Sequence, residues 1–153
     1  DGFYDTSDAG IIDKNGYISV MSRTDDIINC AGHRLSTGSI EEILTLHKDI
    51  AECAVVGFNN ELKGQVPVGL IVLNNSSVNE EETIIEETIN LVREKLGPVA
   101  SYKKSIIVES LPKTRSGKIL RSTISKIFNK ESYKVPATIE DINTLELIKS
   151  LKI

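Results

Sequence analysis

The segment Leu111-Pro112-Lys113-Thr114-Arg115-Ser116-Gly117-Lys118 separates a short apolar run, residues 105–108, from a helical pattern that begins at about residue 119. Proline cannot donate to a sheet ladder and glycine reaches backbone conformations closed to other residues, so this segment should end a strand and form a loop. Such a loop can present Lys118 to anionic oxygens, although its composition alone also fits a solvated basic turn. A phosphate-binding P-loop is excluded, because Pro112 stands where that motif requires its first glycine.

The composition indicates one globular domain. The chain has 153 residues, of which 40% are hydrophobic and 26% charged, enough to bury a core. The net charge of −4 argues against a general nucleic-acid-binding protein, and no apolar run is long enough to span a membrane. We therefore expect neither nucleic acid nor a membrane as a partner. Basic residues nevertheless gather between residues 113 and 130, which leaves room for a local anionic ligand.

The two cysteines and the first residues of the chain indicate what to expect of metal binding and of the cellular compartment. Cys30 and Cys53 have no metal-type spacing to either histidine, so we expect no metal site. Two thiols without a signal peptide favour a reducing, intracellular compartment, either cytoplasmic or mitochondrial. Because the chain begins without methionine, we expect a fragment of a longer protein.

Hydrophobic periodicity predicts an α+β fold, in which an N-terminal β-hairpin precedes a small mixed β-sheet flanked by helices. The expected elements are a hairpin within residues 1–29, an extended piece ending near Gly32, a helix from residue 36 or 37 to about 47, strands over 51–58 and 66–73, a helix over 79–97, a strand over 105–108, and helices over 119–129 and 140–151. Four polar residues at 23–26 mark a boundary between the hairpin and the remainder.

Several residues outside the loop could bind a ligand. Asp8 could accept hydrogen bonds from a sugar diol, although aspartate also forms turns. Arg23 and Arg34 flank a strand-like stretch and could reach phosphate or ribose oxygens of one ligand, with surface ion pairs as the alternative. Gly32 is either a simple turn or a place where a ligand passes close to the backbone. Arg93, near the end of the long helix, could bind an anion or merely complement the helix dipole.

Four motifs taken together resemble the adenylate-forming enzyme superfamily: YDTSDAG at 4–10, SRTDD at 22–26, AGHR at 31–34 and PKTRSGK at 112–118. The closest resemblance is to the AMP-forming short-chain acyl-CoA synthetases. NLVR at 90–93 and the segment at 133–141 resemble the propionyl-CoA synthetase branch more than the acetyl-CoA synthetase branch. Ser7 departs from the glycine usual in the family, and Ala31 stands where acetyl-type enzymes often have serine.

The resemblance implies an acid–thiol ligase. ATP and a short-chain carboxylate, propionate or acetate, would give an acyl-adenylate and pyrophosphate, and coenzyme A would then displace AMP. Mg²⁺ is expected with ATP but bound mainly outside this chain. Residues 1–24 would be the trailing segment of a large N-terminal adenylation domain, the missing partner, and residues 25–153 a mobile C-terminal lid domain that turns about Asp25. We expect the isolated chain to be inactive.

The resemblance also implies roles for single residues. Lys118, on a flexible loop, would be the catalytic residue that bridges the substrate carboxylate and the α-phosphate during adenylation. The other expected contacts are Asp8 and Arg23 with the ribose of ATP, Arg34 near the nucleotide phosphate, Gly32 along the pantetheine passage and Arg93 near the 3′-phosphate of coenzyme A. Acetylation of Lys118 would remove its charge, so the lysine acetylation machinery is a further expected partner.

Two other functions fit parts of the sequence. The chain could belong to an adenylation domain that loads a carrier protein, but Arg93 and the propionyl-type tail argue against that. It could also be a non-catalytic domain that binds an anionic partner through its basic segment, but the acidic total argues against that.

Overall fold

The structure is a computed structural model that describes residues 2–4, 6 and 8–152, without the side chains at 21, 22 and 25. The elements are β1 (Asp8–Ile12), β2 (Ile18–Arg23), the 3₁₀ turn η1 (Thr24–Asp26), β3 (Ile27–Cys30), β4 (His33–Ser36), α1 (Thr37–Leu44), β5 (Ile50–Asn60), β6 (Gly64–Leu73), α2 (Glu81–Leu96), η2 (Pro98–Ala100), β7 (Ser105–Ile107), α3 (Arg121–Phe128) and α4 (Asn143–Ser150). Within the described residues, no helix is long and apolar enough to cross a membrane.

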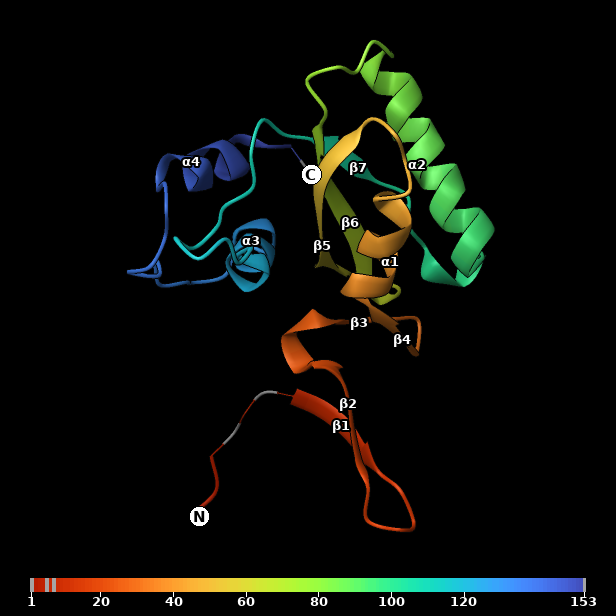
Figure 1. Cartoon of the computed structure of the whole chain (residues 1–153), viewed down its shortest axis with the longest axis vertical. Coiled ribbons are helices and arrows are strands. Elements are labelled where there is room, and N and C mark those ends of the chain that lie inside the picture. Colours follow the sequence, from red (N-terminus) through yellow and green to blue (C-terminus); the bar gives the residue numbers. More distant parts are fainter. Residues whose placement is uncertain (1, 5, 7, 153) are drawn as a thin grey trace.

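The strands form two separate sheets, and this confirms the predicted α+β class (Figure 1). β1 and β2 make an antiparallel hairpin that projects from the body of the molecule. In the five-stranded sheet, β6 pairs antiparallel with β5 along one edge, while β3 and β7 share its other edge. The β6–β7 pair is parallel because the chain crosses over through α2 between these strands. The sheet is therefore mixed, as predicted.

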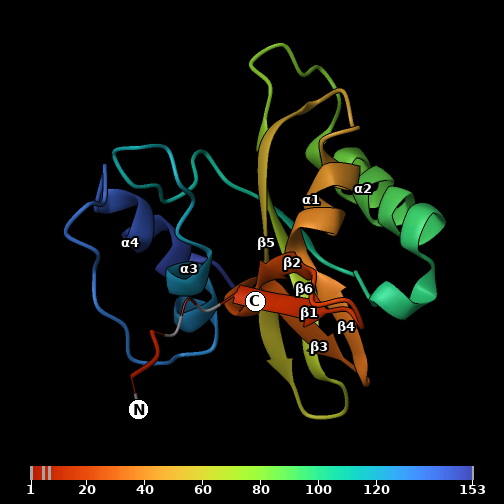
Figure 2. The same ribbon diagram turned by 60° about the horizontal axis from the view of Figure 1, so that its bottom comes forward.

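Helices cover both faces of the five-stranded sheet (Figures 1 and 2). On one face α1 and α2 bury Ile40, Leu44, Ile84 and Val92 against the sheet. On the other face α3 and α4 pack on the sheet in a second apolar cluster. Its buried members are Ala54, Val56, Val68, Leu70, Leu111, Ile124, Phe128 and Ile148. Strands buried on both sides read as continuous apolar runs rather than alternating ones, which is why β5 and β6 were predicted from sequence.

A second hairpin corrects the sequence prediction near Gly32. The extended piece ends at Cys30, close to the predicted position, but the chain then turns at Ala31 and Gly32 and returns as β4, a strand that was not predicted. Both turn residues have positive φ, 48° and 84° respectively. Glycine adopts that conformation at little cost but alanine rarely does, so of the two residues only Gly32 indicated a turn.

The four α-helices in the described part of the chain are shorter than predicted, α2 by the smallest fraction of its length. α1 ends at Leu44 rather than near residue 47, α3 begins at Arg121, and α4 begins at Asn143. Ile119 is excluded from α3 because it forms an antiparallel bridge with Lys113. The predicted start of α4 is not helical either, because the N–H of Glu140 donates to the carbonyl oxygen of Lys113. Long-range pairing has replaced helix at both places.

The β1–β2 hairpin exposes apolar side chains that a monomeric protein usually covers. Ile11, Ile12, Tyr17, Ile18 and Val20 are between 57% and 72% exposed. A group of exposed apolar residues of this size marks a surface that another domain or chain covers. The rest of the molecule has its own core, so the hairpin is not needed to complete it.

Candidate functional site

The backbone of Lys118 is held by its own loop. The N–H of Thr114 donates to the carbonyl oxygen of Lys118 at 2.9 Å, and the N–H of Lys118 donates to Thr114 Oγ1 at 3.1 Å. Gly117 has φ of 80°, which explains why a glycine precedes the lysine. The side chain of Lys118 is exposed. The flexible loop expected from sequence is therefore closed by hydrogen bonds, and freedom remains mainly in the four-carbon side chain.

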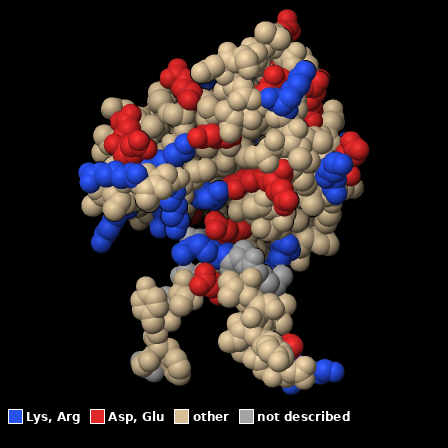
Figure 3. Space-filling model, in the orientation of Figure 1, with Lys and Arg blue, Asp and Glu red and all other residues tan. Residues whose placement is uncertain are grey.

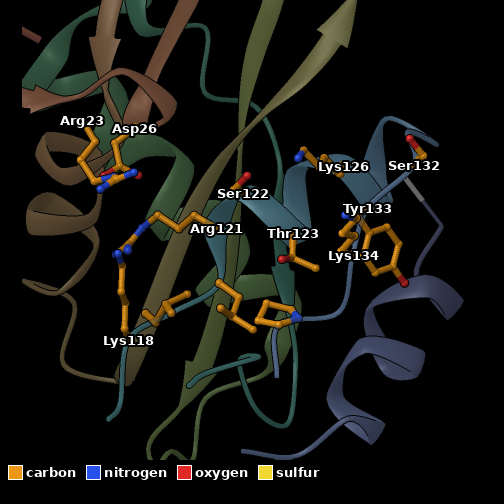
Figure 4. A pocket seen from close by; sticks show the side chains of 13 residues that line it. Arg23, Asp26, Lys118, Arg121, Ser122, Thr123, Lys126, Ser132, Tyr133 and Lys134 are labelled. Carbon is orange, nitrogen blue, oxygen red and sulfur yellow. The ribbon is translucent and has the colours of Figure 1, made fainter. Parts of the chain in front are cut away.

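A cleft of about 680 Å³ opens beside Lys118 (Figure 4). It is lined by residues 23, 26, 118–123, 126, 132–134 and 136. These come from the base of the first hairpin, from residues 111–120, which we call the lysine loop, from α3, and from the segment 130–142, which we call the tail. Figure 4 shows Arg23 and Asp26 on the same side as Lys118 and Arg121, with Tyr133 and Lys134 across α3.

Positive charge dominates this cleft. Its described lining includes the cations of Arg23, Lys118, Arg121, Lys126 and Lys134, whereas the only carboxylate there is that of Asp26. Figure 3 shows lysine and arginine side chains gathered on the flank over α3 and the tail, above the hairpin. A concave site with charge of one sign concentrates the opposite ion, so the cleft suits an anionic ligand.

Two ion pairs attach the cleft to the core. Arg121 donates to both carboxylate oxygens of Glu41 on α1 at 2.7 Å each, and Glu41 Oε1 also accepts the N–H of Val55 at 2.8 Å. Hydrogen bonding to the carboxylate of Glu41 raises the pKa of Arg121 further above its ordinary value. Lys113 Nζ lies 2.6 Å from Glu52 on β5. Both ends of the lysine loop are thus fixed to secondary structure.

Three lysines of the cleft remain available to a ligand. Within the described part of the chain, no carboxylate lies at ion-pair distance from the ammonium groups of Lys118, Lys126 or Lys134. An ammonium without a carboxylate partner can bind an incoming anion without first giving up another contact.

The structure brings Asp8 and Arg23 together. They are register partners in the β1–β2 ladder, directly before η1, and Arg23 lines the cleft. The two candidates for the ribose therefore lie on neighbouring strands beside Lys118. Asp25 is the middle residue of η1, but its side chain lies outside the described residues, as does the whole of Ser7.

Arg34 and Gly32 lie away from this cleft. Arg34 is exposed on β4 opposite Asn29, and Gly32 forms the turn between β3 and β4. Neither residue lines the cleft at Lys118. The sequence suggested that Arg23 and Arg34 could reach oxygens of one ligand, with surface ion pairs as the alternative. In the structure, Arg23 lines this cleft and Arg34 does not.

Arg93 belongs to a second basic face. A smaller cleft of about 330 Å³ is lined by Arg93, Lys63, Ser101 and Lys103, among others. The carbonyl oxygen of Lys63 accepts the N–H of Ala31 at 2.8 Å, and Lys63 Nζ donates to Ser101 Oγ at 2.8 Å. Lys63 therefore connects the turn that contains Gly32 with the cleft that contains Arg93.

Sequence reasoning missed Lys63. It lies in the tight turn between β5 and β6, directly before Gly64, which has φ of 75°. The side chain is half-buried, and among the described residues no carboxylate pairs with it. A half-buried ammonium with a neutral hydroxyl as its partner is a second place suited to an anion. The lysine-glycine pair between two apolar runs was the signal available in the sequence.

A buried hydroxyl network fixes the segment beside Arg93. Tyr102 Oη lies 2.6 Å from Ser105 Oγ, which lies 2.8 Å from Thr88 Oγ1 on α2. Burial raises the pKa of Tyr102 well above its ordinary value. Gly69 makes room for this ring, because a Cβ there would lie 2.0 Å from Tyr102 Oη. The glycine in the middle of β6 is therefore required by packing.

Neither cleft is suited to Mg²⁺. Hard cations need several oxygen ligands, and Asp26 supplies the only carboxylate in the described lining of the first cleft. In the described part of the chain, no group of three or more histidine, cysteine, aspartate or glutamate side chains could hold a metal ion.

The fold and its two basic faces define a small α+β domain that presents cations to anionic ligands. Residues 39–118 match the family described as the AMP-binding enzyme C-terminal domain. The chain belongs to this family. The match confirms the resemblance found in the sequence.

The chain is also similar to parts of larger proteins. The chain is 55% identical over 147 residues to the mitochondrial acyl-CoA synthetase short-chain family member B of Dictyostelium discoideum, covering 96% of this chain and 21% of that protein. It is 43% identical over 150 residues to acetyl-coenzyme A synthetase 1 of Candida glabrata, covering 94% of this chain and 21% of that protein. The crystal structure of an acyl-CoA synthetase from Brucella canis matches with a TM-score of 0.65 and 30% identity, over 84% of this chain and 24% of that one.

The chain spans about a fifth of the length of the curated relatives it matches. These relatives are short-chain acyl-CoA and acetyl-CoA synthetases. A much larger part of each relative has no counterpart in this chain.

Proposed function

We propose that this chain is the C-terminal lid domain of an AMP-forming acyl-CoA synthetase. The complete protein would join a short-chain carboxylate to ATP, giving an acyl-adenylate and pyrophosphate, and coenzyme A would then attack the acyl carbon and release AMP. The observation that supports this most is the presence of two separate basic clefts on one small domain, because the two steps bring two different anionic ligands.

In the adenylation step the Lys118 cleft would face ATP. The carboxylate and the α-phosphate repel each other as they approach, and an ammonium placed between them offsets that repulsion. Lys118 has an exposed side chain and no carboxylate partner among the described residues, as this role requires. Asp8 would accept the ribose hydroxyls and Arg23 would contact the same ribose, since the two residues are register partners beside the cleft. Arg34 would reach the nucleotide phosphate from β4.

In the thioester step the Arg93 cleft would face coenzyme A. Arg93 would bind the 3′-phosphate, with Lys63 close by as a second cation. Gly32 would border the pantetheine chain, because a turn without a side chain lets a ligand approach the backbone. Lys118 would have to leave before the thiol could reach the acyl-adenylate.

The change between the two steps would be a rotation of residues 25–153 about Asp25, with residues 1–24 remaining on the large domain. The separate hairpin and its single 3₁₀ connection support this division. The exposed apolar side chains of the hairpin fit a surface that the absent N-terminal domain covers. Mg²⁺ would arrive with ATP, and its ligands would come from the absent domain.

The decisive test is Lys118→Ala in the complete polypeptide, with the two half-reactions measured separately. Formation of acyl-adenylate should fall at least about a hundredfold, whereas thioester formation from supplied acyl-adenylate should change little. Lys48→Ala, which removes an exposed lysine far from both clefts in the sequence, is the matched control. Equal loss of both half-reactions, or no loss, would contradict the proposal.

For the substrate we propose propionate before acetate, on the strength of Ala31 and the segment at 133–141. The rate of AMP release with acetate, propionate and butyrate tests this choice. The two acids differ by one methylene, which contributes about 1–3 kcal/mol in a hydrophobic pocket, so a preference should be measurable. A higher kcat/KM for acetate would overturn the proposal.

Regulation and location follow as secondary proposals. Acetylation of Lys118 would remove the cation needed for adenylation, and the exposed side chain is accessible to a modifying enzyme. Acetylated enzyme should then lose adenylation and keep thioester formation. The whole protein would be cytoplasmic or mitochondrial, and the name of the Dictyostelium relative favours the mitochondrion. Subcellular fractionation of the complete protein distinguishes the two.

A further inference from the structure

The tail adds a third strand to the lysine loop. The N–H of Arg115 donates to the carbonyl oxygen of Thr138 at 2.9 Å, and the N–H of Glu140 donates to the carbonyl oxygen of Lys113 at 2.9 Å. Between these two hydrogen bonds, Thr114 and Ile139 form an antiparallel bridge. A segment more than twenty residues further along the chain is therefore paired with the residues that precede Lys118.

Thr114 stands between the tail and Lys118. One tail contact lies on each side of it, and Thr114 itself makes two hydrogen bonds to the backbone of Lys118, through its N–H and its Oγ1. Thr114 Oγ1 also lies 3.0 Å from Ser116 Oγ. A shift of the tail would thus move Thr114 and, through it, the Cα from which the lysine side chain starts.

The tail is itself firmly anchored. It follows α3 and leads into α4, whose Leu145 and Ile148 are each only 1% exposed. At the start of α4, Asp141 accepts the N–H of Asn143 through Oδ1 at 2.9 Å and the hydroxyl of Thr144 through its carbonyl oxygen at 2.7 Å. Residues 132–134 and 136 of the same tail form one wall of the cleft.

We propose that tail residues 138–140 position Lys118 for adenylation. This rests on the proposed role of Lys118. The ion pairs of Lys113 and Arg121 fix the two ends of the lysine loop, whereas the tail fixes its middle, where the backbone of Lys118 is held. The tail residues touch no reacting atom, so they act only through Thr114. Misplacing a catalytic group by about 1 Å can cost about a hundredfold in rate, so even a smaller displacement of Lys118 should lower the adenylation rate measurably.

The test compares Glu140→Pro with Glu140→Ala in the complete polypeptide. Proline removes the N–H that donates to Lys113, whereas alanine keeps it and removes only an exposed side chain. With proline, adenylation should fall about tenfold while thioester formation from supplied acyl-adenylate stays within about twofold. The alanine variant should match the unchanged enzyme in both reactions.

A purely structural tail would behave differently. Glu140→Pro would then lower both half-reactions together, in proportion to lost folded protein measured by thermal unfolding, and the proposal would be overturned. Unchanged adenylation in Glu140→Pro would overturn it too. If the proline variant does not fold, Thr114→Val decides instead, because it keeps the side-chain shape but removes the oxygen that accepts the N–H of Lys118. Selective loss of adenylation in Thr114→Val supports the proposal, and no loss overturns it.

The same assay distinguishes this proposal from the proposed role of Lys118 in adenylation, on which it rests. If Lys118→Ala leaves adenylation intact, the proposed role of Lys118 fails whatever the tail does. If Lys118→Ala abolishes adenylation and Glu140→Pro does not affect it, the positioning role alone fails.

Discussion

The two basic clefts are built in different ways. The Lys118 cleft takes its lining from the first hairpin, the lysine loop, α3 and the tail, which are far apart in the sequence. The Arg93 cleft takes its lining from the β5–β6 turn and from the continuous stretch between residues 89 and 103. The first includes residues on both sides of η1, whereas the lining of the second comes only from residues that follow η1, in the β5–β6 turn, α2, η2 and the segment after it. Only the first cleft can therefore change shape when the hairpin moves relative to the sheet.

This difference matches the two proposed tasks. A cleft assembled across a connection can open and close around ATP, and a cleft on one rigid unit can bind coenzyme A after the unit has turned. The following predictions test how independent the two clefts are, in order of expected effect.

The largest effect should come from the support of the Arg93 cleft. Gly69→Ala would place a methyl group against Tyr102 Oη and break the network that holds Tyr102 to Ser105. We expect a loss of about 3 kcal/mol in the free energy of unfolding, measured with urea, because backbone and ring cannot both keep their places. Gly38→Ala is the control, since its Cβ would meet only Ser36 Oγ at 3.6 Å. Equal stability of the two variants would contradict the packing described.

The Lys118 cleft should be weakened next by Glu41→Gln. The amide cannot replace the paired carboxylate, so Arg121 would stay half-buried without its counter-charge. Breaking such a pair costs about 3–5 kcal/mol when it is fully buried, and we expect about 2 kcal/mol here because both side chains are partly exposed. Adenylation should fall and binding of coenzyme A should not. Glu42→Gln, on the exposed neighbour, should leave both unchanged.

A smaller and selective effect is expected for Lys63→Ala. It removes one of the three cations that line the Arg93 cleft, together with the hydrogen bond to Ser101. The KM for coenzyme A should rise about tenfold, since a hydrogen bond to a charged group contributes about 1.5–3 kcal/mol, while adenylation should stay unchanged. Lys95→Ala, an exposed lysine on the same helix as Arg93, serves as the control. A parallel fall in adenylation would show that the clefts are coupled.

The smallest effect concerns pH. Burial, with a further contribution from Glu41, raises the pKa of the Cys53 thiol to about 12. Below pH 9 the thiol is neutral in both the folded and the unfolded chain, but at higher pH only the unfolded chain ionises. Stability should therefore fall as pH rises from 9 toward 12, by about 1 kcal/mol at pH 10. Urea unfolding at several pH values should show this slope, and Cys53→Ala should reduce it. An unchanged slope in that variant would contradict the assignment.

Much of the fold could be predicted because its main elements carry strong periodicity. β5, β6 and α2 each present long apolar patterns bounded by glycine, proline or polar turns. The β3–β4 hairpin could not be predicted, because Ala31 adopts a conformation that alanine rarely takes. The pairing of the tail with residues 113–115 left no local signal, because long-range strand pairing depends on contacts that the sequence pattern does not show.

The sequence indicated single candidate residues but not how they are grouped. Of the candidates Lys118, Asp8 and Arg23, the structure places Lys118 and Arg23 in the lining of one cleft, and Asp8 is the register partner of Arg23 on the neighbouring strand. Their spacing gave no reason to separate Arg34 from that group. Lys63 was overlooked because a single lysine in a turn looks like any solvated charge.

The exposed hairpin also has a consequence for how the domain unfolds. Within the described residues it pairs with no strand of the five-stranded sheet, and η1 is the covalent connection between the two. The amide protons of β1 and β2 should therefore exchange with solvent through small local openings, whereas those of β5 and β6 should exchange only when the whole core opens. The boundary between fast and slow exchange should fall at η1. The part of the chain that unfolds cooperatively would then end at η1, the segment about which we propose that the domain turns.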